Sequence, residues 1–125
     1  MTTPGPRINY GAGSAQRVDT VYPAAPFITE DMLLATVTGI AKALGYRTYH
    51  TFNSRRSAAG YPDLTLIRQA PEPEGTRLIY VELKSARGRL TSDQRDWLSA
   101  LATVPGVEVY IWFPADLSDI EDILR

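Results

Sequence analysis

Two strand-like segments joined by a short polar turn constrain the fold of this chain more than any other feature. Residues 63–68 and 78–84 have the apolar and β-branched content of strands. Between them, residues 69–76 contain two prolines, two glutamates and a glycine, which is typical of a solvent-facing turn. So short a connection favours an antiparallel hairpin. The start of the first strand then lies beside the end of the second.

Charged residues stand at the strand ends that this hairpin brings together. Asp63 follows Pro62, which can open a strand but not sit within a sheet. Glu82 and Lys84 are two apart in the second strand and project from one face, while Leu83 points into the opposite layer. The four residues before Glu82 are apolar on both faces, as in a mid-sheet strand. A carboxylate that continues such a run must pair, bind a metal or open into a cleft.

Two carboxylates and an ammonium group suit metal-assisted hydrolysis of a phosphodiester. Asp63 and Glu82 are candidates to anchor a hard divalent cation, and Lys84 to steady charge on the attacked phosphate. A structural alternative stays open at this point. Asp63 would then cap a turn, and Glu82 with Lys84 would form a surface ion pair of little energetic value.

The helix expected from Thr29, its N-cap, to Leu44 offers another acid. Glu30 continues the apolar stripe of this helix toward the sheet and is a candidate third metal carboxylate, with Asp31 as a less favoured substitute. The alternative is an acid stabilised only by the helix N-terminal dipole.

A second helix is expected after the capping-box pattern of Thr91 and Gln94, and it ends before Pro105. Gln94 continues the apolar stripe that contains Trp97, so it is a candidate to contact a phosphate or a metal-bound water near Lys84. Its capping role alone would also explain its presence.

Basic side chains surround the charged motif. Residues 42–95 contain ten basic and five acidic residues, a net charge of +5, whereas residues 96–125 carry a net −5. This distribution suits a polyanionic partner, although clustering by chance is the alternative. The candidates for contact with nucleic-acid phosphates are four loop arginines: Arg55, Arg56, Arg87 and Arg89.

Several classes of protein are excluded. The absence of cysteine removes disulfides, thiolate zinc sites and cysteine nucleophiles, and the single His50 removes schemes that need two histidines. No segment has the roughly 18 consecutive apolar residues of a membrane span, and no apolar secretory signal begins the chain. We therefore expect a cytoplasmic protein without a membrane partner.

The remaining sequence completes an α/β domain. Residues 1–28 are rich in glycine, proline, alanine and threonine and are expected to form a flexible arm. Residues 29–125 form the domain, with further strands at 46–52 and 107–113 and a short final helix capped by Asp116. The order α-β-β-β-α-β-α predicts one mixed sheet flanked by helices.

Three segments together resemble the PD-(D/E)xK nuclease superfamily: residues 60–64 (GYPDL), 81–84 (VELK) and 90–97 (LTSDQRDW). More narrowly they resemble the small stand-alone VRR-NUC (virus-type replication-repair nuclease) domains, which are similar to archaeal Holliday-junction resolvases. The resemblance extends from about Thr29 to Phe113. It implies the restriction-endonuclease-like αβββαβ core of that superfamily.

The resemblance also implies roles for residues. Asp63 and Glu82 would bind Mg²⁺ or Mn²⁺ together with the Leu83 carbonyl, and Lys84 would orient or activate the attacking water. Glu30 would match the acid of the first helix, although the adjacent Asp31 leaves that alignment open. Gln94 would match the motif glutamine.

The functional hypothesis is therefore a Mg²⁺-dependent endodeoxyribonuclease, acting on structured or branched DNA in replication, recombination or repair. Recognition by shape and backbone suits a core of this size, and a homodimer is compatible with it. The protein would be DNA-associated in the cytoplasm, or in the host cytoplasm if it belongs to a phage. The alternatives are a catalytically inactive nucleic-acid-binding or protein-interaction module of the same fold, and a structural domain with a local ion-pair network.

Overall fold

The expected hairpin is the centre of the fold. In the computed structural model, which describes residues 8–10, 28–52 and 58–125, β3 (Leu64–Arg68) pairs antiparallel with β4 (Arg77–Leu83). Leu64 lies opposite Val81, so the start of β3 is beside the end of β4. A 3₁₀ turn at Pro73–Gly75 closes the hairpin at its tip.

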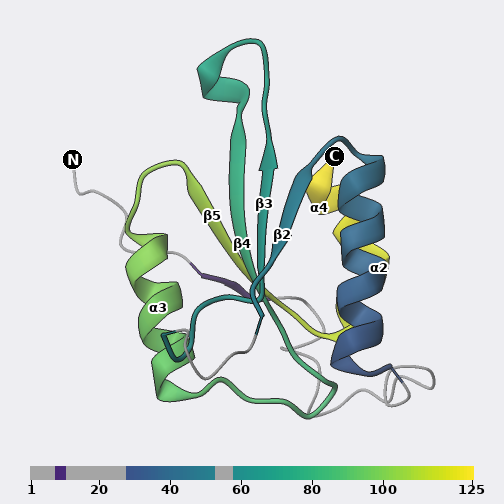
Figure 1. The fold of residues 1–125 in the computed structure, drawn as a ribbon, viewed down its shortest axis with the longest axis vertical. Coiled ribbons are helices and arrows are strands. Elements are labelled where there is room, and N and C mark those ends of the chain that lie inside the picture. Colours follow the sequence, from purple (N-terminus) through teal and green to yellow (C-terminus); the bar gives the residue numbers. More distant parts are fainter. Residues whose placement is uncertain (1–7, 11–27, 53–57) are drawn as a thin grey trace.

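Three more strands complete a mixed sheet with the order β1-β5-β4-β3-β2 (Figure 1). β2 (Arg47–His50) pairs antiparallel with β3, and β5 (Val107–Trp112) pairs parallel with β4. The parallel pairing follows from the crossover helix between β4 and β5. The central position of β4 explains why its sequence is apolar on both faces.

Helices cover the sheet on both sides (Figure 1). α2 (Glu30–Ala43) begins at Thr29, whose hydroxyl accepts a hydrogen bond from the Met32 N–H at 3.1 Å. α2 and α4 (Leu117–Leu124) enclose the larger core with one face of the sheet, and that core includes the buried side chain of Trp112. On the other face, α3 (Ser92–Ala102) packs its Leu98 against β5.

The tip end of the hairpin is fixed to the C-terminal helix by arginines. Arg77 makes a bidentate ion pair with Glu108 of β5, with N–O distances of 2.7 and 2.8 Å. Arg68 and Tyr46 both donate to the Leu124 carbonyl, each at 2.9 Å. These bonds satisfy a carbonyl group that the end of α4 would otherwise leave unpaired.

Three details differ from the sequence-based expectations. Asn9–Tyr10, in the segment expected to be a flexible arm, form the short strand β1, which pairs parallel with β5 and was not predicted. The rest of that arm, residues 1–7 and 11–27, lies outside the described residues. The 46–52 strand is shorter than expected, since β2 ends at His50.

The third difference concerns Asp116. Asp116 is the N-cap residue of α4, as predicted, but its carboxylate accepts a hydrogen bond from the Phe113 N–H at 2.8 Å and makes no capping bond to the first turn of the helix. The side chain therefore closes the 3₁₀ turn Pro114–Asp116 that precedes the helix. Within the described ranges, no helix has the length and apolar character needed to cross a membrane.

Candidate active site

Asp63 and Glu82 meet at the open end of the hairpin, as the spacing predicted. Asp63 directly precedes β3, and its Oδ2 accepts a hydrogen bond from the Leu83 N–H at 2.8 Å. Glu82 is the penultimate residue of β4 and is only 1% exposed. Leu83 is buried in the core on the opposite face, in agreement with its predicted orientation. The register of β3 on β4 thus brings the two carboxyl groups together.

The electrostatics of this pair are unfavourable for a second negative charge. The pKa of Glu82 is raised to about 9, first by burial, then by a hydrogen bond with the Asp63 carboxyl and by its charge. Lys84 acts in the opposite direction, and Glu30 adds to the increase. Glu82 Oε1 is buried and has no hydrogen-bond partner in the part of the chain that the structure describes. A buried carboxylate oxygen without a partner is a site for a cation or a proton.

Lys84 lies beside the acids and is held by the helix on the same face. The residue is 7% exposed, and its Nζ donates to Gln94 Oε1 at 2.7 Å. The same oxygen accepts from the Thr91 N–H at 2.9 Å, which completes the capping box of α3. Gln94 therefore has the capping role that the sequence offered as the alternative, and it also fixes the Lys84 ammonium group, a contact that was not predicted. Its expected contact with a phosphate or a metal-bound water stays a prediction.

Of the two adjacent acids at the start of α2, Glu30 is the one that reaches this end of the sheet. Its Oε1 accepts a hydrogen bond from the Ser85 N–H at 3.2 Å. Asp31 is exposed on the same helical turn. Across the described ranges, no three histidine or acidic side chains are grouped closely enough to hold a metal ion. Asp63 and Glu82 are the two acids in direct contact here, and the expected role of Glu30 as a third metal carboxylate stays a prediction.

Two glycines that were not predicted as site residues shape the site. Gly60 has a φ of +88°, and a Cβ there would lie 2.4 Å from the Asp93 carbonyl carbon of α3. A Cβ at Gly88 would lie 3.1 Å from the Cβ of Lys84. Gly60 thus lets the segment leading to Asp63 approach the helix that carries Gln94. In the sequence these glycines are marked only by their spacing: Gly60 lies three residues before Asp63, and Gly88 lies four residues after Lys84.

The structure describes two of the four arginines that were predicted to contact nucleic-acid phosphates. Arg87 and Arg89 are exposed in the connection between β4 and α3, at the same end of the sheet as the acids. Arg55 and Arg56 lie outside the described residues, so their predicted role stays a prediction.

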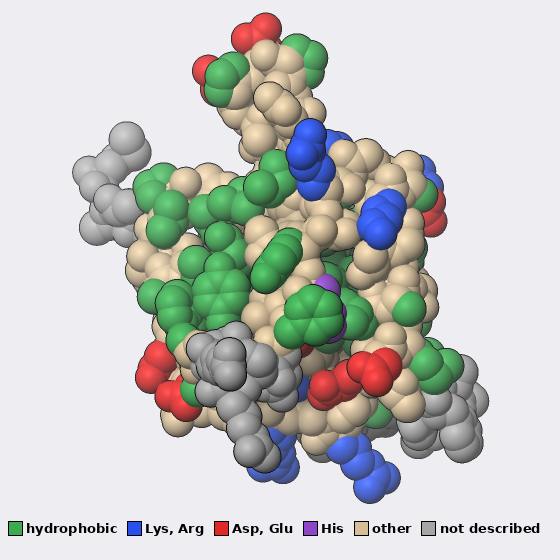
Figure 2. Space-filling model, viewed as in Figure 1, with side chains coloured by type: hydrophobic (Ala, Val, Ile, Leu, Met, Phe, Trp, Pro, Cys, Tyr) green, Lys and Arg blue, Asp and Glu red, His purple; other side chains and the backbone are tan. Residues whose placement is uncertain are grey.

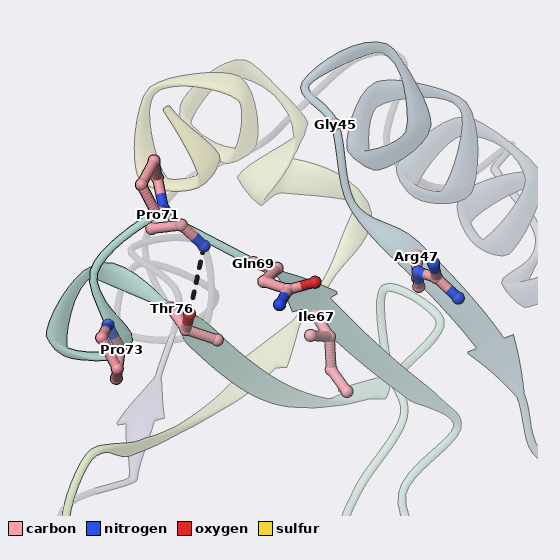
Figure 3. A pocket seen from close by; sticks show the side chains of 8 residues that line it. Gly45, Arg47, Ile67, Gln69, Pro71, Pro73 and Thr76 are labelled. Atoms are coloured by element: carbon pink, nitrogen blue, oxygen red, sulfur yellow. Dashed lines mark hydrogen bonds between the residues drawn. The ribbon is translucent and has the colours of Figure 1, made fainter.

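A hollow of about 440 Å³ lies at the opposite end of the hairpin (Figure 3). It is lined by the hairpin tip, including Pro71 and Pro73, and by Arg47 and Ile67 of the neighbouring strands. Arg47 is the only charged residue among its eight lining residues. This hollow contains none of the predicted site residues and is separate from the candidate active site.

The fold and the site define the class of this protein. An α/β domain with a mixed central sheet and two acids beside a lysine at the end of a hairpin corresponds to the restriction-endonuclease-like core. The family model of the VRR-NUC domain matches residues 22–112, and the chain belongs to this family. The VRR-NUC domain is a nuclease-type domain, which supports nuclease function with DNA as the substrate. Comparison with curated proteins and with solved structures found no match.

The close approach at Gly60 predicts that alanine at this position destabilises the protein, whereas alanine at Gly39 does not. Gly60→Ala is expected to lower the free energy of unfolding by at least about 1–2 kcal/mol, since it adds a backbone clash to an unfavourable φ. Gly39→Ala is the matched control, because its helical site is open and alanine should stabilise α2 by roughly 0.5–1 kcal/mol. Urea denaturation measures both. Equal effects of the two substitutions would show that Gly60 is not needed for the approach.

The raised pKa of Glu82 predicts a pH-dependent stability in the metal-free protein. Between the usual value of 4.5 and about 9, the folded state binds a proton that the unfolded state does not. Stability is therefore greatest below the unfolded pKa and falls as the pH rises, by up to about 1.4 kcal/mol per unit. Glu82→Gln removes this loss, so its stability advantage over wild type should grow from pH 5 to 9 in EDTA.

Glu108→Gln is the control for that measurement. Its partner Arg77 lowers the pKa of the Glu108 carboxyl, so the group is ionised in both states across this range. Its effect on stability should not vary between pH 5 and 9. A Glu82→Gln effect that is equally flat would contradict the assignment of the proton to Glu82.

Proposed function

We propose that this protein is a divalent-metal-dependent endodeoxyribonuclease that hydrolyses phosphodiester bonds of structured or branched DNA in replication, recombination or repair. The observation that carries the proposal is the pair Asp63 and Glu82, two carboxyl groups held together although one of them is almost fully buried. Such a pair opposes folding unless a proton or a cation neutralises it.

The residues fit Mg²⁺, with Mn²⁺ as a substitute. Mg²⁺ prefers oxygen ligands and is commonly held by one or two carboxylates, with water and substrate phosphate as the other ligands. Glu82 Oε1 has no hydrogen-bond partner among the described residues, and Asp63 uses Oδ2 for its bond to the Leu83 N–H. Asp63, Glu82 and the Leu83 carbonyl are the proposed ligands. When bound, the metal supplies charge for the attacked phosphate and lowers the pKa of a coordinated water.

Lys84 is the proposed electrostatic partner of the reacting phosphate. Its ammonium group is buried beside the acids and oriented by Gln94, so it needs little reorganisation to face developing negative charge. It can also hold the attacking water through a hydrogen bond. Gln94 acts through Lys84 and through the start of α3, which makes it a positioning residue in this proposal.

DNA would be held mainly through its backbone. Arg87 and Arg89 are exposed beside the site and are proposed to contact phosphates, with Arg55 and Arg56 in the same role. Recognition of this kind favours shape over base sequence, which suits junctions and other branched structures. A homodimer would allow cleavage of both strands of a junction. The protein would act on DNA in the cytoplasm.

The proposal predicts that cleavage depends on the metal and on Lys84. The purified protein should nick closed circular plasmid and cut a four-way junction in Mg²⁺ but not in EDTA. Lys84→Ala should reduce the single-turnover rate by about 100-fold or more, because a preorganised charge at the phosphate is lost. Asp63→Asn should abolish cutting. Lys42→Ala, on the exposed last turn of α2, is the matched control and should cut at the wild-type rate.

Each other outcome has a defined meaning. Cutting that survives EDTA, or that survives both Lys84→Ala and Asp63→Asn, contradicts this mechanism. Wild-type protein that binds the junction without cutting it would be the inactive binding module instead. Protein that neither binds nor cuts DNA would be a structural domain.

A further inference from the structure

Part of one face of the sheet is not covered by any of the helices that the structure describes. On the side of Glu82 and Lys84, α3 packs mainly on β5 through the cluster of Leu98, Val109 and Ile111. Hydrophobic side chains gather over the strands between α3 and the β2 edge, and charged side chains lie below them (Figure 2). This uncovered surface therefore adjoins the candidate active site.

Aromatic rings dominate this surface. The register places Tyr49 of β2 opposite Thr65 of β3, and Thr65 opposite Tyr80 of β4, so one small residue separates two tyrosines across the strands. The Tyr61 ring meets the Tyr80 ring edge to face at 6.2 Å and the Trp97 ring of α3 at 5.0 Å. We call Tyr49, Tyr61, Tyr80 and Trp97 the aromatic strip.

The strip leads directly to the paired carboxyl groups. Tyr80 precedes Glu82 by two residues on the same strand, so the two side chains share a face about 6.5–7 Å apart. Tyr61 precedes Asp63 by two residues on the neighbouring segment. A strand with one phosphate at the carboxyl groups would have its adjoining nucleotides over these rings.

The exposure of the rings suits stacking better than core packing. Tyr49 is 63% exposed, and Tyr61, Tyr80 and Trp97 are half-buried. Edge-to-face contacts hold the inner rings in place, which reduces the conformational entropy lost when a flat ligand binds. Every base has a flat π-face, so such a platform binds unpaired bases without regard to sequence.

We propose that the aromatic strip binds the unpaired bases of a single DNA strand next to the phosphate that is cleaved. This inference rests on the proposed nuclease function for the position of that phosphate. It defines the preferred substrate as a duplex with a single-stranded branch or tail, in place of fully paired DNA.

Charge distinguishes this occupant from a second copy of the chain. Arg47 is exposed on the same face of the sheet, two residues before Tyr49 in β2. Arg87 and Arg89 are exposed beyond the end of the aromatic strip that adjoins the paired carboxyl groups. A strand that runs along the strip thus meets cations at both ends, where its phosphates need them. A two-fold protein interface centred on the strip would instead bring cations of one copy near cations of the other.

The test measures binding of matched DNA substrates without cleavage. In EDTA, fluorescence anisotropy should show that wild-type protein binds a duplex with a single-stranded tail more tightly than the blunt duplex of the same sequence. Tyr49→Ala should weaken tailed binding by about fivefold or more, as expected for one stacked base, and leave blunt binding unchanged. Tyr49→Phe keeps the ring and should bind like wild type. Met32→Ala, a 52% exposed apolar residue on α2, is the control and should also bind like wild type.

Three results would overturn the inference. The first is equal binding of tailed and blunt DNA by wild-type protein, and the second is a Tyr49→Ala variant that binds the tail normally. The third is a wild-type dimer in sedimentation that Tyr49→Ala dissociates without any loss of tail binding, which would identify a second copy as the occupant. Because the assay needs no cleavage, these results are distinct from failure of the nuclease proposal. That proposal stands or falls on cutting by wild-type protein, Lys84→Ala and Asp63→Asn.

Discussion

The antiparallel register between β3 and β4 is the constraint on which the rest of the structure depends. With Leu64 opposite Val81, Leu64, Leu66, Ile79 and Val81 all enter the core that α2 and α4 cover. A slip of one residue would turn each of these side chains to the other face. The same register sets Asp63 beside Glu82 at one end and the arginine contacts to α4 at the other. Fold and site are therefore specified by one pairing.

At Glu82, the burial of a carboxyl group in the site opposes the stability of the fold. A glutamate at the end of a buried strand loses its hydration, and Asp63 beside it makes ionisation still less favourable. The surrounding structure offsets part of this cost through Lys84, which Gln94 holds in place. Within the described ranges, Glu82 Oε1 nevertheless stays without a hydrogen-bond partner. Unsatisfied buried groups of this kind are expected where a protein retains a group for its function.

Much of this arrangement was predictable because its determinants are local. Strand parity put Glu82 and Lys84 on one face, the short linker gave the hairpin, and the capping-box spacing gave the start of α3. The unpredicted parts depend on contacts between distant segments. The pairing of Asn9 with β5, the approach of Gly60 to Asp93 and the contact of Glu30 with Ser85 join residues far apart in sequence. The contact of Gln94 with Lys84 was not predicted for the same reason, because only the packed helix shows that one oxygen accepts from two donors.

The most direct measurement of the central claim is metal binding itself. Isothermal titration calorimetry would measure Mn²⁺ binding to wild-type protein, Asp63→Asn and Asp31→Asn. The two variants compare the loss of a paired acid with the loss of a nearby exposed aspartate. We expect wild type and Asp31→Asn to bind the ion alike and Asp63→Asn to lose the site. Retained binding in Asp63→Asn, or equal loss in both variants, would contradict the assignment of the metal to the carboxyl pair at the end of the hairpin.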